Sequence, residues 1–324
     1  MYKKVQMIDS LYTIDRGTYP LPAHIARCAQ LAMCLEVSSS PKPGNIDRFS
    51  DYEETRYEHF LASASAVYPV IEEAVSCGTG VGRLIKSAVD ESMRWQKGGN
   101  THFGAFLLLI PFAMAAGEMF EEDETFTIQQ LTESAYRIVK NTTIQDSVDF
   151  YSCFDDAGVK VNSVDEFDLK DSSAIDELHE KDMSLYKLMD IARGYDIIAN
   201  EWVTGFKRCA RCAELIIDGM NGLESPGLQA DINNVTVYAF LKILSENEDT
   251  FISTKYDSET AYHVSCKAKG ILEEMYKIGD NFNSILPLIE KLDQELLQKK
   301  INPGSTADIT IAGLFISLLA GVRF

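Results

Sequence analysis

Four charged residues lie at a stiff turn near the start of the chain: Lys42 within it, and Glu36, Asp47 and Arg48 on either side. The turn at residues 41–44 reads Pro-Lys-Pro-Gly. Its two prolines fix φ and its glycine frees it, so the backbone is expected to be held in place. Charged side chains at a held turn are suited to charged chemistry. The same residues would also make an ordinary connection between two helices, and the pattern alone favours neither interpretation.

A second candidate site lies at residues 98–104, which read Gly-Gly-Asn-Thr-His-Phe-Gly and precede an apolar run. Two glycines open a loop, and Asn100 or Thr101 can cap the helix that follows. The first turn of a helix presents unpaired amides and a partial positive charge, which suits a phosphate group. Lys97 and His102 would add donors. The other interpretation is a capped helix start with His102 at the surface, and the loop alone favours it.

Two more segments place polar side chains beside apolar helices. In residues 302–308, Asn-Pro-Gly-Ser-Thr-Ala-Asp, Ser305 and Asp308 have the spacing of a capping box. Asp308 could instead be a carboxylate that a metal ion shares. Asp196 and Asn200 lie near one helical face beside an apolar stripe. Polar groups on a buried face need partners, either on neighbouring helices or in a site.

One pattern resembles a zinc site. Cys209-x-x-Cys212 and His263-x-x-Cys266 together offer three sulfur ligands and one nitrogen ligand, a set that zinc binds. Zinc ligands usually lie on tight turns, whereas Cys209 and Cys212 fall in an apolar helical run. Free cysteine is also a common core residue. Core packing is therefore the favoured interpretation.

The elements that must hold these residues are helical. Apolar residues recur at i, i+3, i+4 and i+7 in most of the chain, for example in a helix expected over residues 50–76. The best β-like stretch is Thr250–Lys255, and it is weak. Side chains that can cap a helix start precede several segments: Ser50 with Glu53, Thr127 with Gln130, and Asp231.

We predict an all-α protein, with one large domain of roughly a dozen helices over residues 1–324. The acidic segment at about 155–182 is the most polar and is expected to be mobile. Two apolar runs, Phe103–Ala116 and Ile309–Val322, fall short of the ~20 residues that a membrane span needs. We therefore expect both to be core helices, with no membrane partner.

The composition excludes some classes of function. The 324 residues include 49 acidic and 30 basic side chains, a net charge of −19, which argues against a nucleic-acid binder. Seven cysteines and a mixed polar start at Met1–Arg16 predict reduced thiols and a cytoplasmic location. The Walker A, G-x-G-x-x-G, H-E-x-x-H and G-x-S-x-G motifs are absent, so the usual nucleotide-binding and hydrolase folds are not supported.

Taken together, five segments resemble the triphosphoribosyl-dephospho-CoA synthases, the ATP:dephospho-CoA triphosphoribosyl transferases. Each segment is weak by itself, but the five occur in the family's order and span the chain from residue 36 onward. They are Glu36 with Pro41–Asp47; Asn100–Gly104; Thr143, Asp146, Val148 and Tyr151; Asp196–Ala199 with Gly205 and Phe206; and Pro303–Ser305 with Ala307 and Asp308.

The resemblance implies an all-α fold and a pentosyl transfer. Members of the family make the prosthetic-group precursor of citrate lyase and malonate decarboxylase. They join ribose C1′ of ATP to a hydroxyl of dephospho-CoA and release adenine. By analogy with glycoside chemistry, the transition state is expected to resemble an oxocarbenium ion. Such a site needs a base for the hydroxyl, a proton donor for adenine, and Mg²⁺ with basic groups for the triphosphate.

The matched positions also imply partners and residue roles. The expected partners are ATP and dephospho-CoA or a similar acceptor, and a homo-oligomer is compatible with the sequence. The candidate Mg²⁺ ligands are Glu36, Asp47 and Asp308, one of which could be the base. The candidate catalytic residues are Asp47, Asp146 and Asp196. The candidate substrate-binding residues are Lys42, Gly44, Arg48, Asn100, Thr101, His102, Gly104, Lys255 and Ser305.

Three departures from the family pattern indicate a divergent member. Phe103 follows the Thr-His pair where the family often has a basic residue, and Lys255 stands where an arginine is usual. The third is Asp155–Gly158, which replaces a glycine-rich turn. Two other functions stay open. One is a related pentosyl or phosphoribosyl transfer, or nucleotide hydrolysis, on another cofactor precursor. The other is a non-catalytic helical module that binds a nucleotide or a protein.

Overall fold

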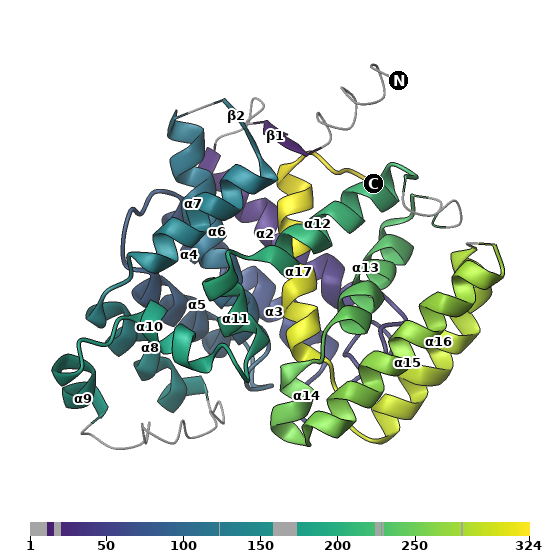
Figure 1. Cartoon of the computed structure of the whole chain (residues 1–324). Coiled ribbons are helices and arrows are strands. Elements are labelled where there is room, and N and C mark those ends of the chain that lie inside the picture. The colour runs from purple at the N-terminus through teal and green to yellow at the C-terminus, as the bar shows by residue number, and fades with distance from the viewer. Residues whose placement is uncertain are drawn as a thin grey trace.

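The computed structural model describes residues 12–15, 21–122, 124–157, 174–223, 228, 230–279 and 281–324. These residues are almost entirely helical, which confirms the predicted all-α class (Figure 1). The helices are α2 (Leu21–Ser38), α3 (Tyr57–Ala66), α4 (Tyr68–Val75), α5 (Val81–Trp95), α6 (Phe103–Glu122), α7 (Ile128–Lys140), α8 (Ile144–Ala157), α9 (Ala174–Glu180), α10 (Leu185–Ala192), α11 (Ile197–Thr204), α12 (Lys207–Met220), α13 (Ile232–Glu246), α14 (Thr250–Lys255), α15 (Ser258–Lys277), α16 (Phe282–Gln298) and α17 (Gly304–Leu319).

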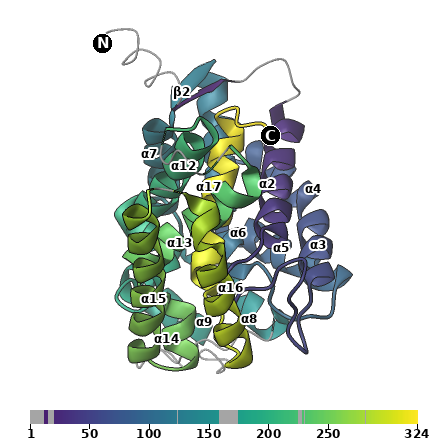
Figure 2. The same cartoon turned by 90° about the vertical axis from the view of Figure 1, so that its right-hand side faces the viewer.

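Helix α17 is the centre of the fold. It packs against α2, α6, α12 and α13, so an element from the end of the chain contacts one from its beginning. Figures 1 and 2 show this yellow helix enclosed by the others. Every residue of α17 is fully buried except Gly304 and Asp308, which are partly buried. The second apolar run is therefore a core helix, as predicted. Asp308 is the one charged residue in this helix.

Helix α6 carries the first apolar run and is also a core helix. Among the described residues it is the one helix that is long and apolar enough to cross a membrane, but 83% of that stretch is buried inside the protein. It packs against α4, α7 and α17. A helix that is apolar on all sides is stable when other helices cover all of it.

A short antiparallel sheet joins β1 (Thr13–Asp15) to β2 (Thr125–Thr127) and pairs Ile14 with Phe126. The end of β2 starts α7 through the predicted capping box. Gln130 N donates to Thr127 Oγ1 (3.2 Å), and Thr127 N donates to Gln130 Oε1 (2.8 Å). The predicted cap of α13 is also confirmed, because Asp231 Oδ1 accepts from the amide of Asn234.

The helix expected over residues 50–76 is divided, and its predicted start at Ser50 is wrong. Asp47 and Ser50 exchange backbone hydrogen bonds in a turn, so the first helix of this segment, α3, begins only after Arg56. A proline in the first turn of α4 then starts a second helix. Proline favours that position because it lacks the amide that a helix start leaves unpaired.

Residues 250–255 form helix α14, so the weak prediction of a strand there is wrong. Asp249 Oδ1 accepts from Ile252 N and caps the helical turn, a contact that outweighs the local β preference. The predicted capping box of Ser305 with Asp308 is wrong as well. Ser305 Oγ accepts from the amide of Phe251, and α17 begins after Pro303 without a side-chain cap.

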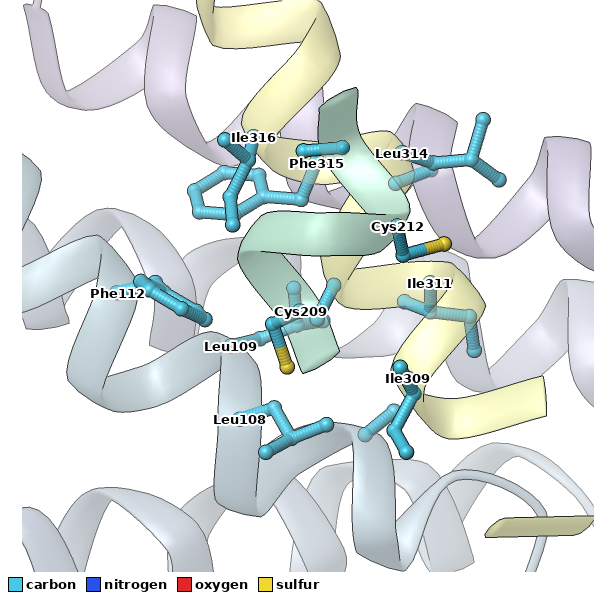
Figure 3. Close-up of a cluster of buried hydrophobic side chains, with 14 of the residues drawn as sticks. Leu108, Leu109, Phe112, Cys209, Cys212, Ile309, Ile311, Leu314, Phe315 and Ile316 are labelled. Carbon is cyan, nitrogen blue, oxygen red and sulfur yellow. The ribbon is translucent and has the colours of Figure 1, made fainter. Parts of the chain in front are cut away.

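The four residues of the possible zinc site are not brought together. Cys209 and Cys212 lie in the hydrophobic core where α12 meets α6 and α17 (Figure 3). Cys266 is exposed on α15, and the His263 side chain is 64% exposed. Close packing against Cys212 explains Gly313, because a Cβ at position 313 would lie 2.5 Å from the Cys212 sulfur.

The acidic segment at about 155–182 is described only in part. Helix α9 occupies its last third, and residues 158–173 lie outside the described residues. The mobility predicted for the segment stays a prediction.

Candidate active site

A cleft of about 330 Å³ lies at the start of α17. Its walls come from five parts of the chain: the end of α2 with the turn after it, the loop before α3, the start of α6, α14, and the segment that joins α16 to α17. Its lining includes the acids Glu36 and Asp308, the amides Asn45, Asn100 and Asn302, the rings of Tyr52, Phe60 and His102, and the lysines Lys255 and Lys300.

The turn at residues 41–44 is held as predicted. Asn233 clamps the residue before it, accepting from Ser40 N (2.9 Å) and donating to Ser40 O (2.8 Å). Gly44 N donates to Asp293 Oδ1 at 2.8 Å. Gly44 has a φ of +72°, and a Cβ there would lie 2.2 Å from the carbonyl oxygen of Ile301. Only glycine fits, because both the backbone conformation and the close approach exclude a side chain.

Glu36 and Lys42 form a buried ion pair beneath the cleft. The Lys42 side chain is fully buried, and its ammonium binds Glu36 Oε1 and reaches Asn45 Oδ1 at 3.4 Å. Burial raises the pKa of Glu36, Lys42 opposes this shift, and Asp47 adds to it. Lys42 does not line the cleft. Lys42 is therefore not placed to contact a phosphate in the cleft. Its ammonium pairs with the Glu36 carboxylate instead.

Asp308 lies in the first turn of α17 and faces the first turn of α6. It accepts a hydrogen bond from the amide of Ala105, and a Cβ on Gly104 would lie 2.2 Å from Asp308 Oδ2. A glycine at position 104 thus lets the two helix starts meet. Burial raises the pKa of Asp308 well above its usual range. The carboxylates of Glu36, Asp249 and Asp196 raise it further.

His102 is buried in the wall of the cleft, contrary to the surface position of the alternative interpretation. Its Nδ1 lies 2.9 Å from Ser63 Oγ, which accepts from Ser92 Oγ at 2.7 Å. Ser63 can then give its own hydrogen to Nδ1, which leaves the ring hydrogen on Nε2. Burial lowers the pKa of His102 to about 3, so the ring is neutral. Nε2 is buried without a partner, as expected of a donor that meets a ligand.

The start of α6 is capped as predicted, because Asn100 Oδ1 accepts from Phe103 N at 3.0 Å. Asn100 and Thr101 both line the cleft. The positive end of the α6 dipole therefore lies at the cleft wall.

Asp249 joins α14 to α17 behind this wall. Its Oδ1 caps α14, and its Oδ2 accepts from both the amide and the hydroxyl of Thr306 at 2.7 Å. Burial raises the pKa of Asp249 to about 6, although these hydrogen bonds oppose the shift. The contact fixes the first turn of α17 and with it the position of Asp308.

Comparison with known proteins identifies the family. The sequence model of the ATP:dephospho-CoA triphosphoribosyl transferases matches residues 22–323. The chain belongs to this family. Its members are transferases, so the chain is an enzyme of that class.

Individual relatives agree with this membership. Two proteins of Vibrio cholerae serotype O1, from strains M66-2 and ATCC 39315, are each named "Probable 2-(5''-triphosphoribosyl)-3'-dephosphocoenzyme-A synthase". Each is 21% identical to this chain over 313 residues, which is 91% of this chain and 88% of the relative. The crystal structure of a "putative triphosphoribosyl-dephospho-coA synthase" from Archaeoglobus fulgidus matches with a TM-score of 0.62 and 26% identity. The match covers 81% of this chain and 100% of that one.

The cleft of this transferase gathers predicted residues from four separate segments. Gly44 and Ser305 do not line the cleft but fix the backbone next to it. The amide of Gly44 donates to Asp293, and the hydroxyl of Ser305 accepts from the amide of Phe251. The predicted residues that line the cleft are Glu36, Asn100, Thr101, His102, Gly104, Lys255 and Asp308.

Two predicted residues lie away from the cleft. Arg48 is exposed, and its Nε donates to the carbonyl of Ser38. Asp146 lies at the opposite end of α5 from residues 98–104, where it accepts from Gly82 N (2.9 Å) and Thr143 N (2.7 Å). The structure therefore does not bring Asp146 together with Asp47 or Asp308.

Asp196 lies close enough to Asp308 to raise its pKa, but it does not line the cleft. Its Oδ1 caps α11 by accepting from Ile198 N and Ala199 N. Asn200 Oδ1 accepts from Arg208, at the start of α12. The Asp196 side chain thus caps its own helix, and only the Asn200 contact is the predicted bonding to a neighbouring helix.

The predicted metal ligands are not preassembled. Within the part of the chain that the structure describes, no three His, Cys, Asp or Glu side chains are grouped closely enough to hold a metal ion. Asp47 Oδ1 accepts from Phe49 N (2.8 Å), and its Oδ2 is buried without a partner. Asp47 lies near the Glu36–Lys42 pair but does not line the cleft with Glu36 and Asp308.

Some residues that hold the site were not found from the sequence. Asp293 is 249 residues away from the turn that it holds. Helical periodicity can indicate that such a residue faces inward, but it does not identify what the residue meets. Asp249 is a second residue of this kind, since it fixes the first turn of α17 through Thr306. Its position just before a short polar segment was the available sign of a helix cap.

Replacing Asp293 with asparagine is expected to stabilise the protein in a pH-dependent way. Asparagine keeps an acceptor for Gly44 N and removes the charge. Burial raises the pKa of Asp293 to about 6, with a further contribution from Asp47. The folded protein thus holds this proton more tightly than the unfolded chain does. The penalty of ionisation is absent below about pH 4, grows up to about pH 6 and is constant above it.

We expect Asp293→Asn to be more stable than wild type at pH 7 by about 1 kcal/mol, after a discount for solvent screening. The two proteins should be equally stable near pH 4. Urea unfolding at pH 4, 5, 6 and 7 measures the difference, and Asp231→Asn, the same change at an exposed helix cap, is the control. A difference that does not change with pH would contradict the prediction.

Proposed function

We propose that this transferase moves the 5-triphosphoribosyl group of ATP onto a hydroxyl of 3′-dephospho-CoA. In this reaction the bond from ribose C1′ to adenine N9 breaks, a bond from C1′ to the acceptor oxygen forms, and the hydroxyl proton is transferred so that neutral adenine leaves. The observation that carries the proposal is the convergence in one cleft of family-matched segments from α2, α6 and α17.

The environments of Glu36 and Asp308, two of the four carboxylates that line the cleft, support different roles. Lys42 is bound to Glu36 and favours its ionised form, so Glu36 is the better ligand for a cation. Burial and then the neighbouring carboxylates raise the pKa of Asp308 well above its usual range. A carboxylate whose pKa is raised accepts a proton more readily than an ordinary one. We assign Asp308 to proton exchange with the acceptor hydroxyl.

The donor set fits Mg²⁺. This ion is usually held by one or two carboxylates together with substrate phosphates and water, so a three-residue protein cage is not required. Glu36 would hold it together with oxygens of the triphosphate. When bound, Mg²⁺ would neutralise triphosphate charge next to the reacting carbon.

The start of α6 is assigned to the nucleotide. Neutral His102 offers its unpartnered Nε2–H as a hydrogen-bond donor, and Asn100 and Thr101 present polar side chains beside it. The partial positive charge of the helix start favours phosphate oxygens. A cytoplasmic location is consistent with the seven cysteines being thiols.

The test is incubation of the protein with ATP, Mg²⁺ and dephospho-CoA. Adenine would be measured by chromatography and the product by mass spectrometry. We expect one adenine for each acceptor consumed, and a product heavier than the acceptor by a triphosphoribosyl group. Release of ADP or phosphate would indicate nucleotide hydrolysis instead. Binding of ATP without turnover with any acceptor would indicate the non-catalytic alternative.

A further inference from the structure

Lys300 has a backbone conformation that normally belongs to glycine. Its φ is +57°, in the left-handed region. It follows the last residues of α16 in a Schellman motif. Lys300 N donates to Leu297 O (3.0 Å), and Ile301 N donates to Leu296 O (2.9 Å). The residue at this position is usually glycine, because a Cβ is unfavourable there. A lysine at this position is unfavourable for stability, which suggests that its side chain has a function.

Three side chains fix the carbonyls around Lys300. Tyr256 OH donates to the carbonyls of residues 299 (3.0 Å) and 300 (2.9 Å). Lys255 Nζ lies 3.4 Å from the carbonyl of residue 300. Tyr52 OH bonds Gly44 O at 2.6 Å and reaches Ile301 O at 3.5 Å. The left-handed turn is therefore held by Tyr256, Lys255 and Tyr52. The side chain of Lys300 itself makes none of these contacts.

The side chain of Lys300 instead lines the cleft. Its ammonium has one ion-pair contact in the described part of the chain, with Glu53 Oε2 at 3.9 Å, where the side chains are 66% and 87% exposed. Such a long, exposed pair is weak. Lys255 and Lys300 are the lysines of the cleft lining, and no arginine belongs to it. A triphosphate in a chain of net charge −19 needs such cations.

We propose that Lys300 binds phosphate oxygens of the nucleotide, and that the left-handed turn serves to present its ammonium at the mouth of the cleft. Glu53 is the group that the phosphate displaces. The proposal rests on the proposed function, because it takes ATP to be the ligand. The proposal adds Lys300 as a binding residue in a backbone conformation that destabilises the fold. Replacing Lys300 with glycine should therefore weaken nucleotide binding and stabilise the folded protein.

The first experiment measures binding of Mg·ATP and of adenosine by calorimetry, without an acceptor. Lys300→Met should weaken Mg·ATP binding about tenfold, the loss expected for one charged hydrogen bond. It should leave adenosine binding unchanged, whereas Lys300→Arg should retain Mg·ATP binding. The matched control is Lys299→Met, which removes the same charge from the neighbouring lysine. Lys299 is bound to Glu295 at 2.7 Å and does not line the cleft, so its replacement should change affinity less than twofold.

The second experiment uses Lys300→Gly, which should raise the midpoint of thermal unfolding and weaken Mg·ATP binding as much as Lys300→Met does. Lys300→Met should leave the midpoint near that of wild type. If Lys300→Met and Lys300→Gly bind Mg·ATP as wild type does, the proposal is overturned. Equal losses for Lys299→Met and Lys300→Met would also overturn it, since they would reflect net charge alone. If wild type binds Mg·ATP through Lys300 but never releases adenine, the proposed function fails while the role of Lys300 stands.

Discussion

Asp308→Asn is expected to slow adenine release from ATP by a factor of about 10² to 10⁴ and to make the folded protein more stable. Asparagine has the same shape and keeps an acceptor for Ala105 N, but it can neither exchange a proton nor bind a cation strongly. It also removes a charge from a site already surrounded by Glu36, Asp249 and Asp196. Loss of activity with a gain in stability is the expected signature of a functional carboxylate, because a residue kept for packing would lose both.

The stability gain has a definite pH dependence. Burial raises the pKa of Asp308, so in wild type the ionisation penalty is absent in acid and grows as the pH rises above the unfolded value. The gain from Asp308→Asn should therefore be close to zero near pH 4 and should increase as the pH rises above it. Chromatography of adenine and urea unfolding at several pH values measure both effects, with Asp231→Asn as the control. Unchanged adenine release would sink the assignment.

The Mg²⁺ dependence of the residual rate separates the two roles available to Asp308. If Asp308 exchanges a proton, kcat falls while the Mg²⁺ concentration that gives half the maximal rate is unchanged. If it is mainly a metal ligand, that concentration rises. The first result is expected, because the ion pair with Lys42 favours the ionised form of Glu36 and makes Glu36 the better cation ligand.

Lys42→Met is expected to destabilise the protein by about 3–5 kcal/mol. The Lys42 and Glu36 side chains are 0% and 2% exposed, so removal of the ammonium leaves a carboxylate buried without its cation. Methionine fills a similar volume, which limits any contribution from a cavity. The loss should shrink as the pH falls, because Glu36, whose pKa is already raised by burial, then becomes neutral. Urea unfolding of wild type and variant at pH 5 and pH 7.5 measures this.

The double variant Glu36→Gln with Lys42→Met is the matched control. It removes both charges together and should recover most of the lost stability, but not adenine release. If Lys42→Met were as stable as wild type at pH 7.5, Glu36 would already be neutral. The assignment of Glu36 as the cation ligand would then be wrong.

Local signals in the sequence were reliable where one segment decides its own structure. The capping box at Thr127 and the cap at Asp231 need only residues three positions apart, and the structure contains both. The two apolar runs predicted as core helices are α6 and α17. Predictions failed where a distant partner decides. The side chain of Ser305 bonds the amide of Phe251 instead of capping its own helix, and Asp249 caps residues that looked weakly extended.

The sequence by itself determined the helical class and, through its resemblance to a family, the short segments to which a site could belong. Local spacing and residue type are enough for that, because caps, turns and apolar faces form over a few residues. Only the tertiary structure decided which charges meet. In the folded protein Lys42 pairs with Glu36, Asp146 lies at the far end of α5, and Asp308 packs against Gly104. The physical reason is that burial and the approach of distant helices set the ionisation of each carboxylate, and both depend on how the whole chain packs.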